Sequence, residues 1–133
     1  RPRLPKVPKA RQPDPGASAA FWGGINEAQL QERLRRFCKA LGLLHYHTHN
    51  SQRSEGGFPD SLIVRTPGEW AKPWLILLEL KSEKGRLSPA QRVWRLVLEG
   101  IEGASDGVVV YRVVRPSTWR DLEMLLTGGQ RGA

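Results

Sequence analysis

The chain has 133 residues, which is enough for one domain with a modest apolar core. It carries 21 Lys and Arg residues against 13 Asp and Glu residues, and the formal net charge of +8 favours a polyanionic partner, either nucleic acid or an acidic surface. The lone cysteine, Cys38, excludes an internal disulfide, and no apolar run approaches the ~20 residues of a membrane span, so we expect a soluble, cytoplasmic protein that is not secreted.

Residues 1–23 are rich in Pro, Ala and basic side chains and have no apolar periodicity, so we expect a flexible, basic, Pro-rich arm. Half of the net charge lies in its first twenty residues, where Asp14 is the only acid beside Arg1, Arg3, Lys6, Lys9 and Arg11. Residues 24–126 are predicted to form the folded domain, and residues 127–133 a disordered tail.

Residues 25–41 have the spacing of an amphipathic helix. Its apolar stripe consists of Leu30, Leu34, Phe37, Cys38 and Leu41. Glu27 projects onto this stripe and is predicted to point inward as a functional acid, whereas Glu32 falls on the opposite side, where basic neighbours such as Arg36 can pair with it. If Asn26 is the N-cap, Glu27 has an alternative role beside the positive end of the helix.

The rest of the domain predicts strands over 43–48, 61–65, 74–81 and 107–114, with helices over 88–102 and 117–126. Thr66-Pro67-Gly68 turns the second strand into a hairpin with the third. The third strand is an uninterrupted apolar run, which implies cover on both of its faces. The order α-β-β-β-α-β-α is typical of an α/β fold with a mixed central sheet flanked by helices.

The helix over 88–102 has clear start signals. Ser88 is the predicted N-cap, Pro89 occupies the first helical position, and Gln91 completes a capping box. The stripe predicted to be buried consists of Ala90, Val93, Trp94, Val97 and Ile101. Capping is a sufficient structural explanation for Gln91, so its part in any site stays open at this point.

Two acids and a lysine meet at the end of the third strand. Glu79 and Lys81 are two residues apart, so on a strand they share one face, and Asp60 begins the strand that pairs with theirs. Hydrolysis of a phosphodiester needs a cation and an activated water, and Mg²⁺ prefers carboxylate and carbonyl oxygens. Asp60, Glu79 and the carbonyl of Leu80 are therefore candidate metal ligands, and Lys81 a candidate partner of the water. The alternative is a surface salt bridge of little energetic value.

The longer pattern is more specific. It consists of Gly57-Phe58-Pro59-Asp60, then Glu79-Leu80-Lys81, then Gly85-Arg86-Leu87-Ser88 followed by Gln91. This pattern strongly resembles the VRR-NUC (virus-type replication-repair nuclease) family of the PD-(D/E)xK superfamily, which has a restriction-endonuclease-like fold. The resemblance covers residues 25–126. It implies an active site of Glu27, Asp60, Glu79 and Lys81, with Gln91 in support and Glu27 near the metal.

The resemblance also implies an activity and partners. Members depend on Mg²⁺ or Mn²⁺ and cleave DNA, and small stand-alone members from bacteria and phages resemble homodimeric Holliday-junction resolvases. We therefore expect a homodimeric endonuclease that acts on branched DNA in replication, recombination or repair. Two alternatives stay open: a catalytically silent DNA-binding module of the same fold, and a restriction-type nuclease.

Other side chains are candidates for DNA contacts. Basic residues near the predicted site suit backbone phosphates, and with His47 they form the set His47, Arg53, Lys84, Arg86, Arg92 and Arg95. His45, His47 and His49 alternate along a strand, but residues four apart lie ~13 Å from each other, too far to share one ion. We expect one of them to be buried. Among the tryptophans, Trp22 and Trp70 are the candidates for exposed base stacking.

Overall fold

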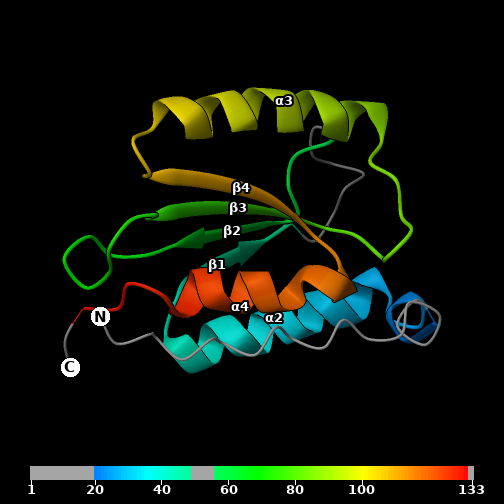
Figure 1. Cartoon of the computed structure of the whole chain (residues 1–133), viewed down its shortest axis with the longest axis horizontal. Helices are drawn as coiled ribbons and strands as arrows, with labels where there is room; N and C mark the ends of the chain where they lie inside the picture. Colours follow the sequence, from blue (N-terminus) through cyan, green and yellow to red (C-terminus); the bar gives the residue numbers. More distant parts are fainter. Residues whose placement is uncertain (1–19, 49–55, 132–133) are drawn as a thin grey trace, which may run out of the picture.

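Four strands form one mixed sheet in the computed structural model, which describes residues 20–48 and 56–131. The spatial order is β1-β2-β3-β4, and the bounds are β1 Leu44–His47, β2 Ser61–Val64, β3 Leu75–Leu80 and β4 Val109–Val114. β2 pairs antiparallel with both β1 and β3, and β4 pairs parallel with β3. Helices α2 (Glu27–Leu41) and α4 (Trp119–Thr127) cover one face, and α3 (Pro89–Ala104) lies on the other (Figure 1). The predicted α/β fold and its element order are confirmed.

The main core lies between the sheet and the α2–α4 layer. α2 begins at a capping box between Asn26 and Gln29 and ends at Gly42, whose φ of 69° suits glycine. Its predicted stripe is confirmed, because Leu30, Leu34 and Cys38 are buried while the remaining two members pack against the same cluster. A short 3-10 turn, η1 (Pro116–Thr118), leads from β4 into α4. No helix among residues 20–48 and 56–131 has the length and hydropathy that a bilayer crossing requires.

A buried arginine ties α4 to the hairpin turn. The Arg65 guanidinium donates to five backbone carbonyls, those of Ala71, Pro73, Leu125, Leu126 and Gly128, at 2.8–3.2 Å. It also lies 4.5 Å from the ring centroid of Trp70, which is only 5% exposed. The prediction that Trp70 is an exposed stacking residue is therefore wrong, because its ring forms one wall of the Arg65 site.

The ends of the domain differ from the prediction. Residues 20–23, assigned to the arm, are helical, while residues 1–19 lie outside the described part. Residues 127–133 were expected to be disordered, but Thr127 closes α4, and the backbones of Gly129 and Arg131 bond to those of Ala71 and Glu69 at 2.7 Å.

The predicted buried stripe of α3 is wrong. Leu98 is its one buried residue, and Trp94 is half-buried, whereas Val93, Val97 and Ile101 are exposed. Glu102 explains the orientation of the helix: its carboxylate accepts from the amide of Tyr111 and the guanidinium of Arg112 on β4. At ~100° per residue the exposed residues lie on the flank of α3 that faces away from this contact.

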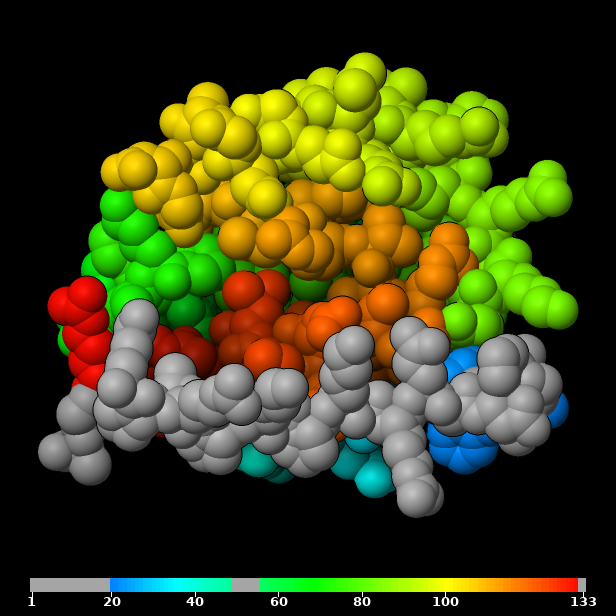
Figure 2. Space-filling model, in the orientation of Figure 1, coloured from blue at the N-terminus to red at the C-terminus, as the bar shows by residue number. Residues whose placement is uncertain are grey.

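That flank has no helix beside it in the described part of the chain. On the same face of the sheet, the β1–β2 half leaves Leu44, Tyr46 and Val64 uncovered, so α3 spans only the half nearest β4. In the space-filling view α3 forms the upper ridge of the molecule (Figure 2). We refer to the exposed set as the apolar shelf; it consists of Leu44, Tyr46, Val64, Val93, Val97 and Ile101.

Candidate active site

Strand pairing brings Asp60 and Glu79 together. Asp60 directly precedes β2, and because Ser61 pairs with Leu78 on the antiparallel β3, the next residue of β3 lies beside Asp60. Oδ2 of Asp60 accepts the backbone amide of Leu80 at 2.9 Å, which fixes the carboxylate against the end of β3. The predicted convergence of these two acids is thus what the strand register produces.

Glu79 is a buried acid, 1% exposed. Burial, and then the negative charge of Asp60, raise the pKa of Glu79 to about 8, although Lys81 opposes the shift. Nε2 of Gln91 donates to Oε1 of Glu79 at 2.5 Å. Gln91 also keeps its capping box, with its Oε1 accepting from the Ser88 amide at 2.8 Å. Gln91 therefore caps α3, as predicted, and also holds the Glu79 carboxyl group by a hydrogen bond.

Lys81 lies one residue beyond the end of β3. Its backbone amide donates to the carbonyl of Val114, and its side chain is 13% exposed. Nζ of Lys81 is 3.8 Å from Oε1 of Glu27, the first residue of α2. The Glu27 side chain is 54% exposed, so it faces the solvent side of the cleft instead of the core. Lys81 also interacts electrostatically with Glu79, so it lies between the buried acid and Glu27.

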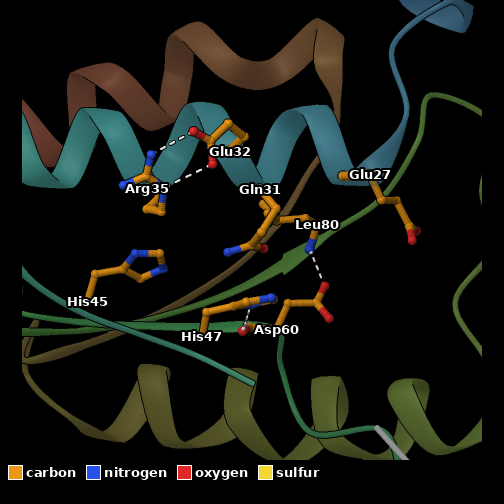
Figure 3. A pocket seen from close by; sticks show the side chains of 9 residues that line it. Glu27, Gln31, Glu32, Arg35, His45, His47, Asp60 and Leu80 are labelled. Carbon is orange, nitrogen blue, oxygen red and sulfur yellow. Dashed lines mark hydrogen bonds and ion pairs between the residues drawn. The ribbon is translucent and has the colours of Figure 1, made fainter. Parts of the chain in front are cut away.

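An open cleft of about 540 Å³ lies on the α2 side of the sheet, and Glu27 and Asp60 line it. Figure 3 shows its lining, which comes from α2, β1, the residue before β2 and the end of β3. Two of the lining residues share a partner: the Ser61 hydroxyl lies 3.1 Å from both Gln31 Nε2 and His45 Nε2. Glu32 also lines the cleft, where hydrogen bonds from Arg35 and Arg36 lower its pKa to about 2. Its predicted pairing with basic neighbours is confirmed, but its position on the cleft was not expected.

The histidines follow the prediction only in part. His45 and His47 are both half-buried and hydrogen-bonded, whereas one buried histidine was expected; His49 lies outside the described residues. Nδ1 of His47 donates to the Asp60 carbonyl at 3.0 Å, which supports the backbone that carries the acid. Burial, and then the charge of His47, lower the pKa of His45.

The donor set fits a hard divalent cation that keeps several waters. Asp60 and Glu79 present two neighbouring carboxylates, one of them buried, and a cation between them would offset their repulsion. Among the described residues no three His, Cys, Asp or Glu side chains are grouped to hold an ion, so an all-protein cage is not present there. Waters and the predicted carbonyl of Leu80 would complete the shell.

The predicted DNA-contacting residues fall into two places. His47 lines the cleft, while Lys84, Arg86, Arg92 and Arg95 line a second pocket of about 430 Å³ between the β3–α3 connection and α3. Arg53 lies outside the described residues. Arg115 lines the same second pocket and was missed. It directly follows β4, and the parallel pairing of Leu80 with Val114 brings it to the same sheet end as Lys81.

The model of the VRR-NUC domain family matches residues 8–110. The match begins and ends earlier than the span expected from the motifs, and it includes every candidate active-site residue. No curated protein and no solved structure matches the chain. Because the match covers most of its length, the chain belongs to the VRR-NUC family of PD-(D/E)xK proteins, and this domain implies a nuclease-type function with DNA as the substrate.

Proposed function

We propose that this chain is a metal-dependent endonuclease that hydrolyses phosphodiester bonds in branched DNA and acts as a homodimer. The observation that carries the catalytic part is the buried carboxyl group of Glu79 beside Asp60, an acid that lines an open cleft. Burial of an acid next to a second acid is costly for stability, which is a recognised sign of a site kept for function.

Each residue has a role that follows from its contacts. Asp60 and Glu79 hold the metal ion, and domains of this kind typically use divalent metals. Bound Mg²⁺ or Mn²⁺ would neutralise charge on the phosphate and supply an activated water. Gln91 keeps the Glu79 carboxylate in one orientation. Lys81 interacts electrostatically with Glu79, and its Nζ is 3.8 Å from Glu27, which lines the cleft. It binds a phosphate oxygen or the attacking water, because its ion pair with Glu27 is weak at this distance.

The homodimer is supported by the apolar shelf. Four of its members, Leu44, Tyr46, Val93 and Val97, are at least 53% exposed, and together with Val64 and Ile101 they form an apolar surface that monomers rarely leave uncovered. The shelf joins a helix ridge to a flat sheet surface, so a two-fold axis can place the ridge of each protomer on the sheet of the other. Such a pair would carry two active sites, as paired cuts in a branched DNA require.

The oligomeric state is tested by sedimentation with Val97→Asp and, as the control, Met124→Asp. Both residues are exposed, and Met124 lies on α4 at the opposite face of the sheet. We expect Val97→Asp to sediment as a monomer and Met124→Asp to remain a dimer like the wild type. A monomeric wild type, alone and on DNA, would contradict the dimer.

The activity is tested by cleavage of a four-way junction, a flap, a splayed arm and a plain duplex of the same sequence. The reactions contain Mg²⁺, Mn²⁺ or EDTA, with Glu79→Ala as the inactive control. We expect cleavage of the branched substrates with either metal and none with EDTA. Binding of DNA without any cleavage would support the silent module, and cutting confined to one sequence in plain duplex would support the restriction-type enzyme.

A further inference from the structure

The second pocket has a strong excess of positive charge. It encloses about 430 Å³ at the start of α3, and five cations line it: Lys84, Arg86, Arg92, Arg95 and Arg115. One acid, Glu83, lines it as well, and the Oε2 atom of this acid already accepts the backbone amide of Ser117 at 3.1 Å. A pocket with this balance favours an anionic occupant.

The connection that carries Lys84 and Arg86 is held in one shape. Arg115 donates to the carbonyls of Ser82 at 2.8 Å and Gly85 at 2.7 Å, and more weakly to that of Glu83 at 3.3 Å. A Cβ at Gly85 would lie 2.8 Å from the Ser82 hydroxyl, so glycine permits this tight turn. Because the carbonyls face Arg115, the basic side chains of the connection are presented on a fixed backbone, which lowers the entropic cost of binding.

Most of the cations in this pocket have no acidic partner among the residues that the structure describes. Arg95 pairs with Glu99 at 2.8 Å. Lys84, Arg86 and Arg92 form no ion pair within residues 20–48 and 56–131. Nearby like charges without counterions repel one another, and a phosphate group between them would remove that repulsion. The arrangement is therefore better suited to a ligand than to the free protein.

The strand order places this pocket and the cleft on opposite sides of the acids. Along one end of the sheet, the order is His47 at β1, Asp60 at β2, Lys81 after β3 and Arg115 after β4. The cleft adjoins the β1 side of this row, and the pocket adjoins the β4 side. In Figure 2 the connection after β3 projects from the right-hand end of the molecule, where an extended ligand can reach it.

We propose that this pocket binds a backbone phosphate of the DNA strand, flanking the phosphate that lies at Asp60 and Glu79. The strand runs along the sheet end from the cleft, past Lys81, into the pocket, and Arg115 acts as a positioning residue that shapes the connection. The inference rests on the proposed nuclease function for the location of the scissile phosphate. Contacts of this kind give affinity and register, and they read no sequence.

The test measures binding of a fluorescent oligonucleotide duplex in EDTA across a range of salt concentrations. The pocket variant is Arg86→Gln with Arg92→Gln, and the control is Lys39→Gln with Arg120→Gln, which removes the same charge from exposed sites on α2 and α4. We expect the pocket variant to lose ~10-fold or more in affinity and to lower the salt slope by about 2, against under ~3-fold for the control. Equal losses in the two variants would overturn the proposal.

Two further measurements keep the result interpretable. Thermal unfolding checks that each variant is folded. If the double variant is unfolded, the single variant Lys84→Gln, on the connection, replaces it. A loss of DNA affinity in Lys84→Gln no greater than that in Lys39→Gln would then overturn the proposal. Since EDTA prevents metal-dependent cleavage, the outcome is independent of activity. If the wild type never cuts DNA, the proposed nuclease function is refuted but phosphate binding by the pocket is not. If the wild type is active and the two variants lose affinity equally, only phosphate binding by the pocket is refuted.

Discussion

Replacing Glu79 with glutamine removes the one buried acid of the site with little change in shape. Because burial and Asp60 raise the pKa of Glu79 to about 8 from an ordinary 4.5, the unfolded chain releases this proton before the folded chain does as the pH rises. The folded state therefore loses stability between about pH 4.5 and pH 8. By pH 7 the loss is on the order of 3 kcal/mol.

We expect Glu79→Gln to be more stable than the wild type at pH 7 by about that amount, and similar to it at pH 5. The new amide can still accept from Gln91 and can donate to Asp60, so the local hydrogen bonds survive. The assay is urea unfolding in EDTA at both pH values. The control is Glu99→Gln, an exposed acid paired with Arg95 on α3, which should show less than ~1 kcal/mol of change at either pH.

The sign of the difference in unfolding free energy between Glu79→Gln and the wild type tests whether Glu79 is a strained buried acid. A Glu79→Gln protein that is less stable than the wild type at pH 7, or an equal difference at pH 5 and pH 7, would refute the assignment of Glu79 as a strained buried acid. Addition of Mn²⁺ gives a second reading, since a bound cation should raise the stability of the wild type at pH 7 and leave Glu79→Gln nearly unchanged.

Three further predictions follow from the same contacts. The Mn²⁺ affinity of the wild type should rise by up to ~10-fold per pH unit between pH 6 and pH 8, because the ion displaces the Glu79 proton. Calorimetry in buffers of different ionisation enthalpy should detect the released proton. An affinity that does not change with pH would contradict the raised pKa of Glu79. Gln91→Ala should lower the unfolding free energy by ~1–2 kcal/mol through the lost cap and should slow cleavage, whereas a normal rate would assign Gln91 to capping alone. Arg65→Met should lower the free energy of unfolding in urea by at least ~3 kcal/mol, because it leaves buried carbonyls without hydrogen-bond donors. A smaller decrease would show that water takes the place of the guanidinium.

The convergence of the two acids was predictable because it depends on local rules. A hairpin places the start of one strand beside the end of its partner, so Asp60 and Glu79 had to meet once β2 and β3 were assigned. The capping box over Ser88 and Gln91 is likewise encoded within four residues. Helix periodicity correctly identified the face of α2 that is buried, since that helix packs on a fully covered part of the sheet.

The errors concern features that depend on distant packing. Periodicity shows which flank of α3 is apolar, but not that the helix covers only half of the sheet and leaves that flank exposed. Trp70 was assigned to the surface because nothing local reveals that Arg65 is buried against it. Arg115 was missed because its proximity to Lys81 depends on the register between β3 and β4, which are joined through α3.

The most direct test of the central claim is the rate of plasmid nicking in Mn²⁺ by Asp60→Asn. The control is Glu32→Gln, which changes an acid of the same cleft that is already paired with Arg35 and Arg36. If Asp60 and Glu79 hold the catalytic metal, Asp60→Asn should lose at least ~10³-fold in rate, and Glu32→Gln should stay within ~3-fold of the wild type. Nicking by folded Asp60→Asn protein at the wild-type rate would contradict the account.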